Sequence, residues 1–268
     1  MDSKTAILRK LHQGPRILVL PNAWDVASAR IFEQAGFPAI ATTSAGVANS
    51  LGYPDGESIP RDEMIGIVAR IARAVSVPVT ADVEGGYGDP VGTAEALVQV
   101  GVVGMNLEDS NRKNPEVELA AQLRAIEMIR ARTDLVINAR NDIYLFGLGD
   151  PATRFERTVE RLNAYRKAGA DCLFVPGVRD AETIGKLARA LHGPLNILAT
   201  AGVPPVADLE QLGVARVSVG SGPMRAVMGL TDRIAKELRE RGTYASFTEG
   251  AFPYLDANRL FELSTSTD

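Results

Sequence analysis

Short apolar runs alternate with longer amphipathic stretches along almost the whole chain. Runs of strand length occur at residues 17–20, 39–42, 77–81, 102–107, 135–139, 172–175, 195–199 and 214–219. Stretches with apolar residues at helical spacing lie at residues 25–35, 61–75, 90–100, 115–131, 151–168, 181–191 and 205–212. Several of them end in a glycine just before the next run, which is typical of a helix that ends and returns to a sheet. The pattern predicts eight strands that alternate with helices.

The apolar runs show no strict alternation with polar residues. Such runs indicate strands buried on both faces, as in a parallel sheet covered by helices. Eight strand–helix units within about 250 residues favour a closed (β/α)8 TIM barrel over an open, doubly wound α/β sheet. No linker-like stretch interrupts the pattern, so a single barrel domain over residues 1–268 is predicted.

The residues after the eighth run form a separate feature. A helix is predicted over residues 223–241, and a C-terminal helical extension covers residues 243–268. The extension is rich in apolar and aromatic side chains. A surface of this kind favours packing against a neighbouring subunit. The alternative is that the extension closes the bottom of its own barrel.

Composition and charge narrow the class of function. Apolar residues make up 46% of the 268 residues, enough for a large core. The net charge is -4 with both signs interspersed, so we expect a small-molecule substrate and neither nucleic acid nor a membrane as partner. The single cysteine, Cys172, lies in an apolar run and is expected to be inert core. With no disulfide, no leader-like segment and no membrane-length run, a cytoplasmic protein is expected.

Carboxylates follow two neighbouring strands of the predicted barrel. Residues 77–88 read VPVTADVEGGYG, and the run ends in Asp82 and Glu84 at a spacing that places both on one face of a strand. The next run ends in Glu108 and Asp109. Active sites of TIM barrels lie at the carboxyl ends of the strands. Asp82, Glu84 and Glu108 are therefore predicted to hold Mg²⁺, with Mn²⁺ as the alternative, directly or through water.

Other strand ends supply groups that suit an anionic substrate. Arg140 follows the fifth run and is predicted to pair with a substrate carboxylate through two hydrogen bonds. Backbone N–H groups and hydroxyls of Thr43, Ser44 and Ala45 are predicted to bind the same carboxylate, and Asn196 is assigned to substrate binding as well. A 2-oxo acid would chelate the metal, which would accept the charge of an enolate.

With these motifs in place, the chain resembles the isocitrate lyase and phosphoenolpyruvate mutase superfamily, including its 2-methylisocitrate lyase and phosphonopyruvate-type members. The resemblance covers residues 18–229 and is carried by PNAWDVASARIFEQAGF, TTSAGVANSLGYPD, ADVEGGYG, NLED and INARND. It implies a Mg²⁺-dependent (β/α)8 enzyme that makes or breaks a C–C or P–C bond beside a carboxylate. It also implies that the last helix is exchanged between subunits of a homodimer or homotetramer, and that Asp55 is the aspartate kept near the reacting group.

The chain departs from the superfamily pattern at three places. Lyases of the superfamily carry a Lys-[Lys/Arg]-Cys-Gly-His loop, whereas the loop here reads DSNRKNPEVEL, in which Lys113 and Asn114 resemble the loop of phosphonopyruvate-directed members. Lys113 is assigned a catalytic role on that basis, with an ordinary surface lysine as the alternative. Pro176 stands where lyases have a glutamate and mutases a histidine, and Glu84 replaces an aspartate.

Three functions remain open at this point. The leading prediction is a Mg²⁺-dependent carbon–carbon lyase that cleaves or decarboxylates a small 2-oxo or 2-hydroxy (di)carboxylic acid through a metal-stabilised enolate. The first alternative is a P–C bond enzyme, similar to phosphonopyruvate hydrolase or phosphoenolpyruvate mutase. The second is a barrel that binds a 2-oxo acid with little catalysis, which the short loop motivates.

Overall fold

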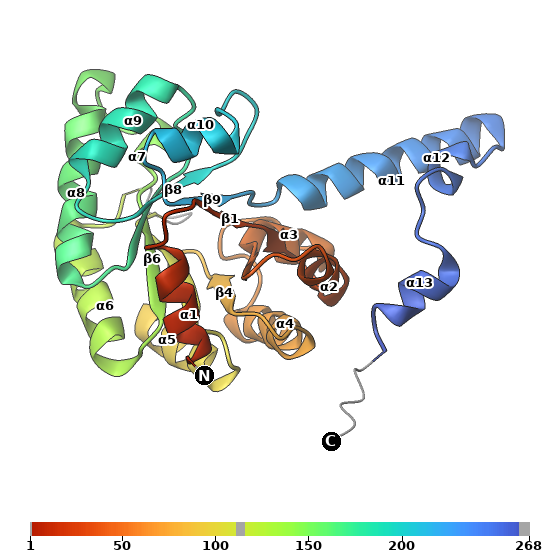
Figure 1. Ribbon diagram of the computed structural model, residues 1–268, viewed down its shortest axis with the longest axis horizontal. Coiled ribbons are helices and arrows are strands. Elements are labelled where there is room, and N and C mark those ends of the chain that lie inside the picture. Colours follow the sequence, from red (N-terminus) through yellow and green to blue (C-terminus); the bar gives the residue numbers. More distant parts are fainter. Residues whose placement is uncertain (1, 111–115, 263–268) are drawn as a thin grey trace.

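The computed structural model describes residues 2–110 and 116–262, and its centre is a parallel barrel (Figure 1). The strand segments are β1 Leu18–Leu20, β2 Asn22–Ala23, β3 Ile40–Thr42, β4 Val79–Asp82, β5 Gly104–Glu108, β6 Val136–Arg140, β7 Cys172–Val175, β8 Leu195–Leu198 and β9 Arg216–Ser218. Each pairs in parallel with the next strand around the ring. The predicted α/β TIM barrel is confirmed.

The first strand of the barrel is split in two at Pro21. β1 pairs with β9, with Leu20 opposite Ser218, whereas β2 pairs with β3, with Asn22 opposite Ala41. Pro21 lacks an N–H group, but its carbonyl still accepts a hydrogen bond from Ala41 N at 2.9 Å. The strand predicted at residues 17–20 is therefore followed by a second short segment that was not predicted, and together the two bring the ends of the sheet into a nearly closed barrel.

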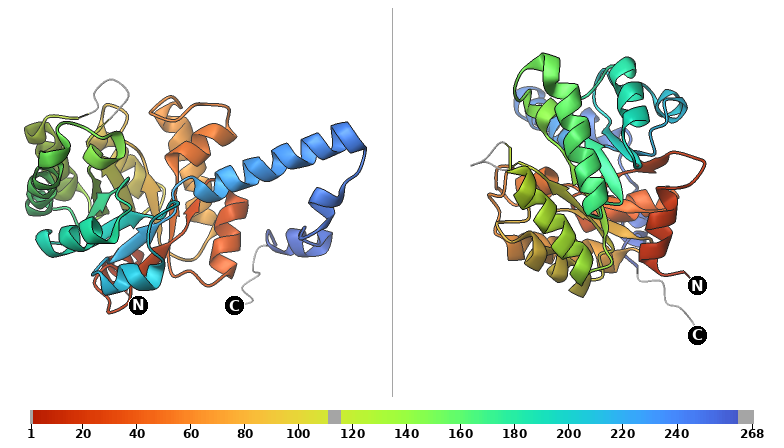
Figure 2. Two further views of the ribbon diagram at one scale, coloured as in Figure 1. Left: turned by 90° about the horizontal axis from the view of Figure 1, so that it is seen from above. Right: turned by 90° about the vertical axis from the view of Figure 1, so that its left-hand side faces the viewer.

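Helices surround the strands on the outside (Figures 1 and 2). Their bounds are α2 Val26–Gln34, α3 Ser44–Ser50, α4 Arg61–Ala74, α5 Pro90–Gln99, α6 Leu119–Arg132, α7 Ile143–Phe146, η1 Pro151–Thr153, α8 Arg154–Ala168, α9 Ala181–Ala190 and α10 Val206–Gln211. α3 and α7 were not predicted, because each is a short helix inside a loop at the carboxyl end of a strand. α6 begins at Leu119, later than the predicted start at residue 115, which lies outside the described residues.

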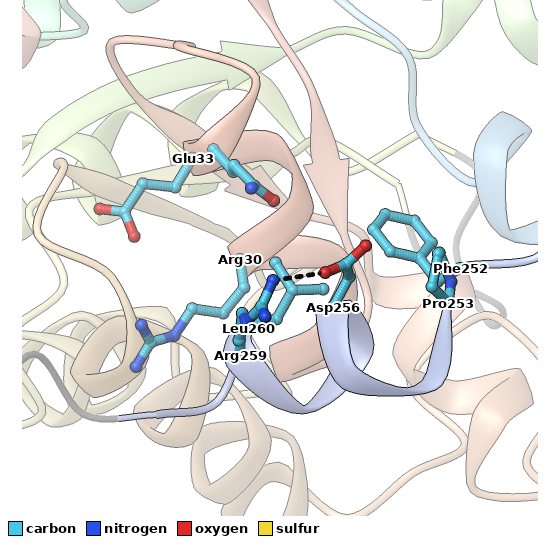
Figure 3. A pocket seen from close by; sticks show the side chains of 8 residues that line it. Arg30, Glu33, Phe252, Pro253, Asp256, Arg259 and Leu260 are labelled. Carbon is cyan, nitrogen blue, oxygen red and sulfur yellow. Dashed lines mark hydrogen bonds and ion pairs between the residues drawn. The ribbon is translucent and has the colours of Figure 1, made fainter.

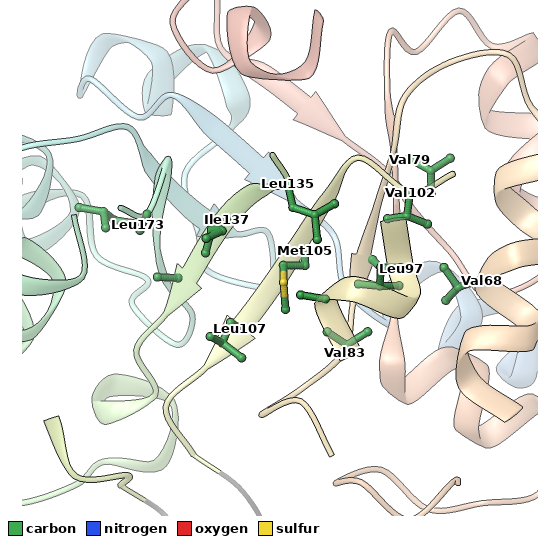
Figure 4. Packing of buried hydrophobic residues seen from close by; sticks show 14 of the residues in the cluster. Val68, Val79, Val83, Leu97, Val102, Met105, Leu107, Leu135, Ile137 and Leu173 are labelled. Atoms are coloured by element: carbon green, nitrogen blue, oxygen red, sulfur yellow. The ribbon is translucent and has the colours of Figure 1, made fainter. Parts of the chain in front are cut away.

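Side chains alternate between the helix layer and the barrel interior along each strand. On β4, Val79 and Ala81 pack in the apolar layer between strands and helices, so Thr80 and Asp82 face inward. Figure 4 shows this layer, in which Val79, Leu97 and Met105 lie between β4, β5 and α5. The layer anchors the strands, and the inward positions at their carboxyl ends are left for chemistry.

The N-terminal helix α1, Lys4–Leu11, closes the other end of the barrel. Its Leu8 is fully buried in a cluster with Leu18, Leu20 and Val136, which are inward residues near the start of their strands. The alternative prediction, that the C-terminal extension closes the bottom of its own barrel, is therefore wrong. The N-terminal helix already occupies that place.

The C-terminal segment projects from the barrel as an arm. α11, Gly222–Arg241, extends away from the strands, and α12, Ala245–Thr248, and α13, Tyr254–Arg259, turn back beside it (Figures 1 and 2). The Glu237 carboxylate fixes the turn by accepting hydrogen bonds from Ala245 N at 2.9 Å and Ser246 N at 2.8 Å. Within residues 2–110 and 116–262, no helix is both long enough and apolar enough to cross a bilayer.

Candidate active site

A cavity of about 210 Å³ opens at the carboxyl ends of the strands. The residues that line it are Asn22, Thr43, Ser44, Ala45, Asp55, Asp82, Asn106, Arg140, Leu145, Phe174, Pro176, Leu198, Ser218, Gly220 and Ser221. They include six of the predicted site residues: Thr43, Ser44, Ala45, Asp55, Asp82 and Arg140. We call this space the mouth cavity, and its size suits a ligand of a few carbon atoms.

A larger cavity of about 510 Å³ lies elsewhere, between α2 and the C-terminal arm (Figure 3). Arg30 and Glu33 line its α2 side, and Asp256 and Arg259 line the arm side and pair with each other at 2.8 Å. That pair is largely exposed to solvent, and no strand end contributes a side chain. The chemistry of the predicted site residues belongs to the mouth cavity.

Asp82 is held from two sides at the end of β4. One carboxylate oxygen, Oδ2, accepts hydrogen bonds from Ser44 N at 3.1 Å and Ser44 Oγ at 2.9 Å. The other, Oδ1, lies 3.4 Å from the amide nitrogen of Asn106. Thr43 caps α3 by accepting from Gly46 N, and a side chain at Gly46 would collide with Thr43 and Trp24. The turn predicted to bind substrate thus also orients Asp82.

Glu84 lies in the loop after β4 with a strained backbone. Its φ of 53° is in the left-handed region, which costs a residue with a side chain free energy and is typical of functional sites. The carboxylate accepts a hydrogen bond from Glu57 N at 2.6 Å. Burial, followed by the nearby Asp82 and Asp55 carboxylates, raises the pKa of Glu84 to about 8. Asp55, Asp82 and Glu84 therefore form a cluster of carboxyl groups beside the mouth cavity.

Arg140 lies between two carboxylates at the end of β6. Its Nη1 is 2.6 Å from Glu108 Oε2, and its Nε donates to Asp142 Oδ1 at 2.6 Å. Burial would lower the pKa of Arg140, but the two carboxylates raise it, so the guanidinium stays charged. Burial raises the pKa of Glu108 well above its usual value, and Arg140 opposes that rise. Asp142 in turn accepts a hydrogen bond from Ser110.

Three of the predicted site residues that the structure describes, Asn196, Glu84 and Glu108, do not line the mouth cavity. Asn196 on β8 is fully buried inside the barrel and accepts a hydrogen bond from Ser218 Oγ at 3.2 Å, so Ser218 and not Asn196 faces the cavity. Lys113 lies outside the described residues. Glu108 lies on the wall of a neighbouring cavity of about 580 Å³ that Glu57 and Tyr87 also line.

Sequence reasoning missed several residues that line or build the mouth cavity. Asn106 lies two positions before Glu108 on β5, so strand alternation could have placed it on the same inward face. Asp142 follows β6, but nothing in the sequence indicated that it holds Arg140. Asn22 links β2 to the residues that follow β9. Its side-chain oxygen accepts hydrogen bonds from Val219 N and Gly220 N, both at 2.9 Å.

The donor set of the mouth cavity fits a hard divalent cation. The carboxylates of Asp55 and Asp82 line the cavity and would supply oxygen ligands, and their charges add to the effect of burial in raising the pKa of nearby Glu84. Among the residues that the structure describes, no three Asp, Glu, His or Cys side chains come together as a metal cage. Mg²⁺ is usually bound through one or two carboxylates and keeps several waters, so Asp55 and Asp82 would suffice to hold it.

A parallel barrel with carboxylates and an arginine at the carboxyl ends of its strands defines the class of TIM-barrel enzymes. The family model of phosphoenolpyruvate phosphomutase matches residues 8–239. The chain belongs to that family, within the superfamily of phosphoenolpyruvate mutase and isocitrate lyase, whose members are carbon–carbon lyases and mutases. The resemblance noted in the sequence is confirmed.

Individual relatives support this assignment. Protein Rv1998c of Mycobacterium tuberculosis H37Rv is 38% identical, over 80% of this chain and 81% of its own length. Oxaloacetate decarboxylase 2 of Pseudomonas putida W619 is 30% identical, over 86% and 78%. A crystal structure of oxaloacetate acetylhydrolase with its product oxalate superposes with a TM-score of 0.85 at 27% identity, covering 97% of this chain and 94% of that one. The chain is therefore similar over most of its length to an oxaloacetate decarboxylase and an oxaloacetate acetylhydrolase.

Proposed function

We propose that the protein is a divalent-metal-dependent carbon–carbon lyase that acts on a small 2-oxo or 2-hydroxy acid through an enolate. The observation that carries the proposal is the mouth cavity, which has Asp55 and Asp82 on its wall together with Arg140. Acids that bind a cation and an arginine that binds a carboxylate are the two requirements of this chemistry. The similarity to an oxaloacetate decarboxylase and an oxaloacetate acetylhydrolase supports the same reaction class.

In this mechanism Asp82 would hold the cation, and Glu84 and Glu108 would act on it through water. When bound, Mg²⁺ or Mn²⁺ supplies positive charge that stabilises negative charge on the 2-oxo group. Arg140 and the turn of Thr43, Ser44 and Ala45 bind and orient the substrate carboxylate.

Proton transfer at the reacting carbon falls to Asp55, which lines the cavity. Lys113 is a further candidate for proton transfer, on the loop that follows Glu108.

Turnover distinguishes the proposal from its alternative within the superfamily. Purified protein with Mg²⁺ is given oxaloacetate, alkyl malates or phosphonopyruvate, and pyruvate or phosphate release is followed. Cleavage of a carbon substrate supports the proposal. Turnover of phosphonopyruvate alone favours the P–C bond enzyme, which the name of the family model also supports. Binding of these acids without turnover of any would indicate a 2-oxo acid binding protein.

We further propose that the chain forms a homodimer or homotetramer through its C-terminal arm. Support comes from apolar side chains on the arm that are exposed in the single chain, among them Tyr244 at 61%, Tyr254 at 81% and Leu255 at 64%. Monomers rarely expose so continuous an apolar surface. Light scattering should give a mass of two or four chains, and Tyr254→Glu with Leu255→Glu should lower it, whereas a monomeric wild type would refute the proposal.

A further inference from the structure

One side of the mouth cavity is apolar. Leu145 on α7, Phe174 and Pro176 at the end of β7, and Leu198 at the end of β8 line it, and we call these four side chains the apolar wall. The polar lining groups come from the rest of the ring, from β9 with Ser218 and Ser221 round to Arg140 on β6. Building on the proposed function, we infer that the substrate is a 2-oxo or 2-hydroxy acid with a short alkyl group that packs against the apolar wall.

The apolar wall is fixed by close backbone packing. Gly177 has a φ of +91°, and a Cβ there would lie 2.7 Å from Leu145 Cα, so only glycine allows the loop after β7 to rest on α7. At Gly220, with a φ of +52°, a Cβ would lie 3.1 Å from Leu198 Cδ1. Phe174 is buried at 4% exposure. A wall held in place before the ligand arrives gains affinity for an apolar group without an ordering cost.

Charge in the polar part of the lining sets the orientation of the ligand. Arg140 is the cationic side chain among the residues that line the mouth cavity, and it is already bound by Glu108 and Asp142 at 2.6 Å each. Its guanidinium lies 5.9 Å from the ring centre of Phe174, at the edge of the apolar wall. A ligand carboxylate at Arg140 therefore directs the rest of the carbon chain along the wall.

A charged group at the apolar wall would be unfavourable. A phosphonate or an additional carboxylate there would lose its water, and Arg140, the cationic lining side chain, would already be engaged by the first carboxylate of the ligand. An alkyl group in the same place gains from burial instead, about fourfold in affinity for each methylene removed from water. The wall therefore favours alkyl-substituted acids and disfavours phosphonopyruvate.

A homologous series of 2-oxo acids measures this preference. Calorimetric titration of the protein with Mg²⁺ and pyruvate, 2-oxobutanoate or 2-oxopentanoate should give a Kd that falls about fourfold from the first acid to the second. Phosphonopyruvate should bind more weakly than 2-oxobutanoate. Equal affinity across the three acids, or tightest binding of phosphonopyruvate, would overturn the inference but leave a metal-dependent site. No binding of any acid would overturn the proposed function and the inference with it.

Variants of the apolar wall locate the effect. Leu198→Asn, which keeps the size but adds an amide, should remove the preference for 2-oxobutanoate over pyruvate. Leu198→Met, which replaces the same side chain by another apolar one, should retain the preference for 2-oxobutanoate. Leu145→Asn repeats the test at a position with 39% exposure, and Leu51→Asn at 38%, outside the cavity, is the matched control. A preference unchanged in both wall variants would overturn the inference.

Discussion

Arg140 Nη1 lies 2.6 Å from Glu108 Oε2, in a pair that is mostly shielded from solvent. Arg140, which is predicted to bind the substrate, is therefore already paired with Glu108, which is predicted to interact with the metal. A metal that interacts with Glu108 would weaken this pair and free the guanidinium for a substrate carboxylate. The pair thus gives a physical reason for substrate binding to depend on the metal.

Arg140→Lys is expected to weaken binding of 2-oxo acids by about tenfold or more, because an ammonium cannot reproduce the two-pronged geometry of a guanidinium. Calorimetric titration with Mg²⁺ present measures the loss. Arg132→Lys is the control, because Arg132 forms an exposed pair with Glu95 at 3.2 Å. An unchanged Kd in Arg140→Lys would remove Arg140 from the substrate site.

Asp82→Ala is expected to abolish stabilisation by Mg²⁺ with a 2-oxo acid while the variant remains folded. A ligand at about 100 times its Kd adds about 2.7 kcal/mol to the free energy of unfolding, which a thermal-shift assay detects easily. Asp62→Ala changes an aspartate with 89% side-chain exposure on α4 and should respond like the wild type. Retained metal-dependent stabilisation in Asp82→Ala would refute the metal assignment.

The contact between His12 and Arg216 leads us to expect that the free energy of unfolding depends on pH. Both are buried inside the closed end of the barrel, where His12 Nδ1 contacts Leu8 O at 2.8 Å and Nε2 lies 3.4 Å from Arg216 Nη1. A carbonyl only accepts, so Nδ1 carries the proton and Nε2 faces the guanidinium as an acceptor. Burial, and then the charge of Arg216, lower the pKa of His12 to about 4.

A histidine with a lowered pKa stabilises the fold fully above its unfolded pKa of about 6.5, and the stabilisation is lost as the pH falls toward 4. Between pH 7 and pH 5 this residue should cost about 2 kcal/mol of unfolding free energy. Urea denaturation at the two pH values should show a smaller loss in His12→Gln than in the wild type. His192→Gln, at an exposed position, should follow the wild type. Equal losses in all three proteins would show that His12 is not buried neutral.

Arg161→Met is expected to destabilise the fold by about 3 kcal/mol, because it leaves the buried Asp109 carboxylate without its cation. Asp109 Oδ2 accepts from Arg161 Nε at 3.0 Å, and Asp109 follows β5 at the edge of the site. Urea denaturation measures the change. Arg157→Met breaks a half-exposed pair with Glu116 and should cost less than about 1 kcal/mol. Similar costs for the two variants would contradict this difference in burial.

Much of the site could be predicted because barrel strands deliver their last residues to one end. Asp82 and Arg140 were found from strand ends alone, and both line the mouth cavity. Asn196 was predicted at the substrate site but lies one layer of side chains deeper in the barrel, behind Ser218. The run at residues 195–199 did not reveal where its strand ends relative to the neighbouring strands. Strand stagger in a barrel is a property of the closed ring and leaves no mark in one strand's sequence.

The sequence by itself determined the alternation and order of the eight main strands and the long helices between them, since burial on both faces and helical spacing are local patterns. It also determined which acids stand at strand ends. Only the tertiary structure decided that Pro21 splits the first strand, that Glu108 and Asp142 bind Arg140, and that Leu145, Phe174 and Leu198 form one wall. These relations join residues far apart in the chain, so their distances depend on register and closure of the barrel, which the whole fold sets.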